Sequence, residues 1–259
     1  MPPSHPAARP DDARPDDARR RHDARRDRWI AHRARRRQEF VAAALRVLRD
    51  TGPDLPMGAV AAQAGVTKPV LYRYFADKAA LVQALGEFAS GLLRERLVPA
   101  LTAGGPAMAR IRGGVGAYFA IIDEHPDLYW LLTRHGAGDS TADGAGGPGL
   151  VARQKEFIAT TLTAVYGDYL RAYGLDSGAA EPWAFGITGL VQSTGEWWLT
   201  RRSMSRAQVT EHVSQLIWWA LTGVLRDAGI TADPDGPVPV PRLVPGIRPG
   251  GLAAPRRPR

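Results

Sequence analysis

The sequence has no cysteine, so disulfide bonds, thiolate nucleophiles and the common cysteine-based zinc sites are excluded. It also has no uncharged apolar run near the roughly 18 to 20 residues that a membrane-spanning helix requires. The best candidates, 182–195 and 213–225, are bounded by charged residues or histidine. The first thirty residues alternate arginine with aspartate and do not resemble a secretion signal. We therefore expect a cytoplasmic globular protein with no cofactor, no bound metal and no contact with a membrane.

Lysine is scarce as well, because only Lys68, Lys78 and Lys155 among the 34 lysines and arginines are lysines. Arginine thus carries most of the positive charge behind the net charge of +8, and arginine abundance alone does not indicate a function. Histidines are not paired at metal-binding spacing, no glycine-rich loop precedes a Lys-Ser or Lys-Thr pair, and no nucleophile elbow occurs. The sequence therefore does not predict an enzyme.

Two polar tails enclose a helical region. Residues 1–28 contain a doubled Pro-Asp-Asp-Ala-Arg unit and almost no large apolar side chains, which predicts a disordered tail. Residues 231–259 are rich in proline and end in arginines, which predicts a second disordered tail that is extended and solvated. Between the tails the apolar spacing is helical, with no strand-length alternation, so we expect an all-α fold. We divide this region into a first domain of short helices, 29–80, and a second domain of longer helices, 81–230.

In the first domain, residues typical of helix ends and helix starts indicate three short helices. Gly52-Pro53 ends the first of them, and the second is expected at 57–63. Gly65 permits a left-handed turn into the third helix, where the Thr67 hydroxyl can act as the cap. Asp77 is expected to cap the helix that follows. This is the arrangement of a helix-turn-helix, whose second helix can enter the major groove of DNA.

The string AQAGVTKPVLYRYFADK, from Ala62 to Lys78, resembles the signature of TetR-family transcriptional regulators along its whole length. The resemblance covers about residues 35–95. It implies an N-terminal helix-turn-helix DNA-binding domain followed by a helical domain for ligand binding and dimerisation. It also implies that the recognition helix approaches base edges and phosphates of double-stranded operator DNA. The residues assigned to DNA contact in this way are Thr67, Lys68, Pro69, Tyr72, Tyr74 and Lys78.

Two positions depart from the family pattern. Pro56-Met57 replaces a threonine or serine that donates to phosphate in many members, and Tyr74 stands where many have histidine. Arginines that lead into the first helix offer a compensating grip, because each phosphate neutralised releases about one counterion. A charge run can also be a solvated surface, which we favour for the more distal arginines. The residues added to the expected DNA contacts are Arg33, Arg36 and Arg37.

The second domain is rich in aromatic residues, which fit a hydrophobic pocket for a lipophilic effector. For any single aromatic residue, an ordinary place in the core is the alternative. This half also resembles regulators of lipid metabolism, some of which sense acyl-CoA, so the expected effector is an acyl-CoA or a fatty acid. The predicted pocket residues are Tyr118, Phe119, Ile122, Tyr129, Trp130, Phe157, Tyr166, Trp183 and Trp197.

Small and apolar residues along the last two helices indicate close helix packing. The resemblance implies that these helices pair with their copies in a second subunit, which would require a near-palindromic operator. Adjacent residues on a helix point about 100° apart, so the Trp197-Trp198 pair should address two different surroundings. The residues predicted for the dimer interface are Gly186, Gly189, Ser193, Val213, Leu216 and Ala220.

Taken together, these features predict a ligand-responsive transcriptional regulator. The simplest form is a repressor that binds a palindromic operator as a dimer and is released by a small hydrophobic effector. The alternative is an architectural or non-specific DNA-binding protein that depends on its arginine-rich arm. Such a protein would bind all DNA with similar affinity, whereas specific binding would survive competitor DNA.

Overall fold

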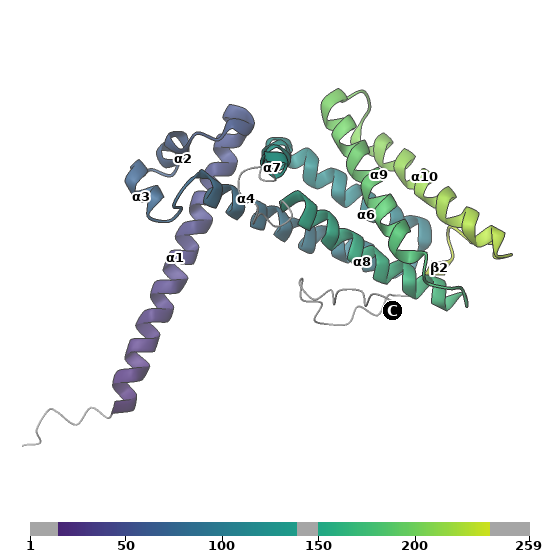
Figure 1. Ribbon diagram of the computed structural model, residues 1–259, viewed down its shortest axis with the longest axis horizontal. Coiled ribbons are helices and arrows are strands. Elements are labelled where there is room, and N and C mark those ends of the chain that lie inside the picture. Colours follow the sequence, from purple (N-terminus) through teal and green to yellow (C-terminus); the bar gives the residue numbers. More distant parts are fainter. Residues whose placement is uncertain (1–14, 139–149, 239–259) are drawn as a thin grey trace, which may run out of the picture.

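A computed structural model describes residues 15–138 and 150–238, and most of these residues are helical (Figure 1). The all-α prediction is confirmed; the described residues add one short antiparallel pair, β1 (Gly105–Pro106) with β2 (Pro237–Val238). The helices are α1 (Pro15–Thr51), α2 (Met57–Gln63), α3 (Lys68–Tyr72), α4 (Lys78–Leu92), α5 (Val98–Thr102), α6 (Ala107–Glu124), α7 (Pro126–Gly138), α8 (Leu150–Ala172), α9 (Ala180–Arg201) and α10 (Arg206–Asp227), with a 3₁₀ turn, η1 (Gly52–Asp54), and a π-helical turn, η2 (Leu93–Leu97).

The N-terminal part of α1 projects away from the other helices (Figure 1). The prediction of a disordered tail over 1–28 is therefore wrong for residues 15–28, while residues 1–14 lie outside the described chain. Helix formation here does not need a core, because alanine and arginine have high helix propensity. The prediction relied on the missing apolar residues and underestimated this local stabilisation.

The segment after α10 folds back onto the start of α6. The Ala107 amide donates to the Gly236 carbonyl at 3.3 Å, and the Met108 amide donates to the Pro234 carbonyl at 3.2 Å. These are amides of a helix N-terminus, which have no acceptor within the helix. The prediction of a disordered tail over 231–259 is therefore wrong for residues 234–238, and residues 239–259 lie outside the described chain.

The core of the first domain forms around Phe40, which is fully buried. Its ring centroid lies 5.1 Å from that of Tyr74 and 6.3 Å from that of Phe75. Two fully buried leucines of α7 and α3, Leu131 and Leu71, belong to the same cluster. Because α7 comes from the second domain, this core joins the helix-turn-helix to the rest of the chain.

The helix ends around α3 are formed largely as expected. Gly65 has φ +68°, as its turn requires, and the Asp77 carboxylate accepts from the Ala80 amide at 2.7 Å. The expected cap at Thr67 is wrong, because its hydroxyl makes no capping hydrogen bond. Pro69 removes one of the two amides that a capping side chain could bind, and the Val70 amide donates to the Thr67 carbonyl instead.

Replacing Phe40 with alanine should lower the free energy of unfolding by about 3 to 5 kcal/mol, because it removes a fully buried ring from the core. Urea unfolding followed by circular dichroism at fixed protein concentration measures this change. The control is Trp29→Ala on the same helix, where the side chain is 60% exposed and the change should stay within about 0.5 kcal/mol. Equal effects of the two substitutions would contradict the packing described here.

Candidate functional site

Helix α3 presents one face to the core and the other to solvent. Leu71, within the helix, and Phe75, just after it, are fully buried, whereas Tyr72 is 45% exposed. Lys68 and Pro69 are exposed in the first turn of the helix. The outer face therefore offers a hydroxyl, an ammonium group and a flat apolar ring to a partner. These groups suit phosphate oxygens and base edges.

Lys68 lies across α2. A Cβ atom added at Gly58 would lie only 2.7 Å from Cε of Lys68 and 3.3 Å from its Nζ. The missing side chain at Gly58 therefore makes room for the lysine stem beside α2. This packing restrains a residue predicted to read bases.

The arginines of α1 meet the end of the recognition helix. Arg37 donates from Nη1 to the Tyr74 carbonyl at 2.8 Å, and its guanidinium carbon lies 4.4 Å from the Phe75 ring centroid. The guanidinium carbon of Arg33 lies 6.0 Å from the Tyr74 ring centroid. Arg36 pairs with Glu39 on the same helix. The predicted arginines thus border α3, and Arg33 is the exposed one among them.

Lys78, at the start of α4, donates to the backbone carbonyl of Asp54 in η1. Lys78 and Arg37 therefore both bind carbonyl groups within the domain, and Tyr74 is half-buried against Phe40. Each cation retains further N–H donors that can reach a phosphate. The residues predicted for DNA contact that are openly exposed are Arg33, Thr67, Lys68, Pro69 and Tyr72.

A cavity of about 180 Å³ lies among the helices of the second domain. Its lining is mostly aliphatic and is supplied by α4 to α10 together with η2. Along α6 it extends from Ala107 to Ile122, roughly 22 Å at 1.5 Å per residue. The cavity is therefore elongated and apolar. The predicted pocket residues that line it are Tyr118, Ile122, Tyr129, Tyr166 and Trp183.

The other four predicted pocket residues lie outside the cavity lining. Phe119 is fully buried in the core, where its ring meets that of Trp198 at 5.6 Å between centroids. Trp130 packs against the same core, Phe157 is half-buried on α8, and Trp197 is 40% exposed on α9. For Phe119 and Trp130, the core alternative is the correct interpretation. Trp197 differs from its buried neighbour Trp198 because adjacent helical positions point in different directions.

Hydrogen-bonded polar groups stand at one part of the cavity wall. Tyr129 Oη donates to Glu196 Oε1 at 2.7 Å. Burial raises the pKa of Tyr129, and the hydrogen bond to Glu196 raises it further. Burial also raises the pKa of Tyr118 well above its usual value. Both phenols therefore remain protonated and neutral at physiological pH.

His125, between α6 and α7, also lines the cavity. Its ring lies 5.8 Å from the Phe88 ring of α4 in an edge-to-face arrangement. Burial lowers the pKa of His125, opposed by the nearby Glu124 carboxylate. The imidazole therefore favours its neutral form and acts as a packing group between the cavity and α4.

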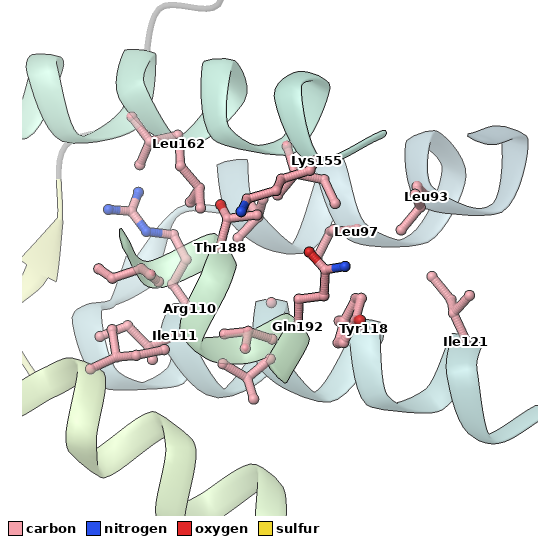
Figure 2. Close-up of a pocket in the computed structure, with 18 of the residues that line it drawn as sticks. Leu93, Leu97, Arg110, Ile111, Tyr118, Ile121, Lys155, Leu162, Thr188 and Gln192 are labelled. Carbon is pink, nitrogen blue, oxygen red and sulfur yellow. The ribbon is translucent and has the colours of Figure 1, made fainter. Parts of the chain in front are cut away.

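Several polar lining residues were missed by the sequence analysis, namely Arg110, Lys155, Thr188 and Gln192. Figure 2 shows them on three helices around the cavity, with Lys155 reaching from α8 toward Thr188 on α9. A signal for Lys155 was present. It stands three and seven residues before Ile158 and Leu162, in phase with the apolar stripe of α8.

The outer face of α9 and α10 carries large exposed apolar side chains. Leu216 is 48% exposed and Trp219 is 64% exposed, and Val224 follows on the same helix at 37%. Of the residues predicted for the dimer interface, Gly186, Ser193, Leu216 and Ala220 are exposed.

Two of the predicted interface residues are placed differently. Val213 is buried in the core between α10 and α6, so its assignment to an interface is wrong. Gly189 is half-buried, and a Cβ atom there would lie 3.8 Å from Lys155 Nζ. Helix α10 is apolar on two sides, and the stripe read from the sequence mixed the inner side with the outer one.

Within residues 15–138 and 150–238, no helix is both long and apolar enough to cross a membrane. The same ranges hold no group of three or more histidine, aspartate and glutamate side chains placed to bind a metal ion. The features described above are the exposed face of α3, an apolar cavity and an exposed apolar face on α9 and α10.

Two family models match the chain. Residues 40–85 match the model of bacterial regulatory proteins of the tetR family, and residues 96–232 match the tetracyclin repressor-like C-terminal domain. Together with the helix-turn-helix, these matches show that the chain belongs to the TetR family of DNA-binding transcriptional regulators. The predicted resemblance is confirmed.

Relatives support this assignment. An HTH-type transcriptional regulator of Mycobacterium tuberculosis, described as uncharacterized, is 29% identical over 80% of this chain and 86% of its own. The HTH-type transcriptional activator FasR of Mycolicibacterium smegmatis is 27% identical over 74% and 85%. The fold is also that of a tetR-family regulator from Streptomyces coelicolor, with TM-score 0.58 and 24% identity over 75% of this chain and 83% of that one.

Proposed function

We propose that this protein is a ligand-responsive repressor that binds a near-palindromic operator as a homodimer in the cytoplasm. A small hydrophobic effector in the cavity releases it from DNA. The protein acts by binding alone, without enzymatic activity. The observation that carries the proposal is a shared wall: Ala89, Leu128 and Leu132 line the cavity and also belong to the core of the helix-turn-helix domain. A ligand that displaces these side chains would move the elements that support α3.

The DNA-facing part of the proposal depends on the exposed side of α3. Lys68 and Pro69 would approach base edges, and Tyr72 would donate to a phosphate. Arg33 and Arg37 flank the same end of the domain and add positive charge. The proposed DNA contacts also include Arg36, Thr67, Tyr74 and Lys78.

A two-fold dimer through α9 and α10 would bury the exposed apolar face. Contiguous exposed apolar side chains mark interaction surfaces on soluble proteins. Leu216 and Trp219 are the largest such contributions on α10, with Gly186 and Ser193 giving close approach on α9. This symmetry would place two recognition helices on successive half-sites.

The effector proposed is a fatty acid or an acyl-CoA, because the cavity is long and mostly aliphatic. Binding of such a chain would be favoured by apolar burial. The relative FasR is named an activator. A regulator that binds DNA more tightly with effector is therefore the second candidate, and the effect of ligand on operator affinity separates the two.

Lys68→Ala should weaken operator binding by about 1 to 3 kcal/mol and relax base preference at one position of each half-site. Tyr72→Phe should weaken binding by about 0.5 to 1.5 kcal/mol for every sequence, since it removes a hydrogen bond to phosphate. Lys78→Ala should also weaken binding across sequences. Fluorescence anisotropy against operator and scrambled DNA, at one salt concentration, measures all three.

Lys78→Ala also removes the bond to Asp54, so its thermal unfolding must be compared with that of the unsubstituted chain. Arg153→Ala, exposed on α8, is the control expected to leave affinity unchanged. Unchanged operator affinity in all three contact variants would show that α3 is not the DNA-reading helix. Similar affinity for operator and scrambled DNA would favour the architectural alternative.

Trp219→Asp should convert the dimer to a monomer and lower operator affinity more than about tenfold, because it places a charge at the centre of the apolar face. Light scattering after size exclusion reports the mass. Tyr173→Asp is the matched control, since Tyr173 is another exposed aromatic but lies near the end of α8. A Trp219→Asp variant that keeps the dimer mass refutes this interface.

A further inference from the structure

Lys155 contributes an ammonium group to the mostly aliphatic wall of the cavity. Lys155 lines the cavity and is only partly exposed, and its Nζ lies 3.8 Å from the position of a Cβ at Gly189. Figure 2 shows the side chain crossing from α8 toward Thr188 on α9. The lysine therefore directs its charge across the cavity instead of away from it.

This charge has no counter-ion among the described residues. Lys155 takes part in none of the ion pairs or side-chain hydrogen bonds of residues 15–138 and 150–238. The described cavity lining includes no aspartate or glutamate, whereas it includes a second cation, Arg110. A partly buried cation without a partner is costly, so a bound anion would offset that cost.

Polar side chains of α9 line the cavity beside Lys155. The Thr188 hydroxyl donates to the Ala184 carbonyl at 2.7 Å, so its proton is not available to an anion, whereas the Gln192 amide can still donate. Gln192, one turn further along α9, adds an amide to the cavity wall. Beyond Lys155, the lining of α8 continues as Ile158, Leu162 and Val165. Charge and apolar surface thus follow one another along a single helix.

We propose that Lys155 binds the anionic head group of an elongated apolar effector, whose alkyl chain lies along the aliphatic stripe of α8. The inference rests on the proposed function, because it takes the cavity to be the effector site. The shared chemistry is an alkyl chain with an anion at its end. The anion is either a free carboxylate or the phosphates of a coenzyme A ester. Lys155 thereby gives such ligands a higher affinity than neutral lipids of the same length.

The test titrates the full chain with palmitate and palmitoyl-CoA below their micelle concentrations and with hexadecanol below its solubility limit. Quenching of tryptophan fluorescence is a direct readout, because Trp183 and Trp218 line the cavity. At least one anionic ligand should bind about tenfold or more tightly than hexadecanol, as expected for a charge-assisted hydrogen bond. Lys155→Met should remove that preference while leaving hexadecanol binding unchanged, and Lys155→Arg should retain it.

Arg153→Met, two residues earlier and exposed, is the matched control and should bind all three probes like the unsubstituted chain. A preference for palmitate supports a carboxylate, and a preference for palmitoyl-CoA supports phosphate. Equal binding of hexadecanol and both anions overturns the inference, and so does an equal loss of all three in Lys155→Met. Either result leaves the proposed effector cavity standing. Failure of every probe to bind overturns both the inference and the proposed lipid effector.

Discussion

Helices α4 and α7 pack against both parts of the molecule and join the helix-turn-helix to the cavity. Leu131 is fully buried in the core of the first domain, and its neighbours Leu128 and Leu132 belong to that core and to the cavity wall. Ala89 of α4 does the same. Close-packed interiors transmit displacements because they cannot absorb volume locally. In the proposed function, a ligand in the cavity would act on the position of α3 through these shared side chains.

The π-helical turn η2 contributes to the same wall. Pro99 has no amide hydrogen, and its ring would clash with the Glu95 carbonyl in a regular α-helix, so the helix is wider before it. The widened turn directs Leu93 and Leu97 to the cavity. Pro99, which breaks helical regularity, thus shapes the cavity wall at the point where α4 ends.

The helix-turn-helix could be predicted from the sequence because its signals are local. Gly65 and Asp77 act where the chain turns or a helix starts, and the motif from Ala62 to Lys78 is contiguous. The cavity could be predicted only in part, because its lining comes from many helices and depends on their rotation. Aromatic content therefore suggested Phe119, which faces the core, and overlooked Lys155. The helical N-terminal part of α1 was not predicted, because the lack of apolar residues was given more importance than the local helix propensity.

The central claim is that one dimer places two copies of α3 on a specific symmetric DNA site. Selection of bound fragments from genomic DNA, followed by footprinting of the preferred fragment, tests it most directly. We expect two protected half-sites of related, inverted sequence, with protection that survives excess competitor DNA and is lost in Lys68→Ala. Protection without a preferred sequence, or over a single half-site at the mass of a monomer, would contradict it.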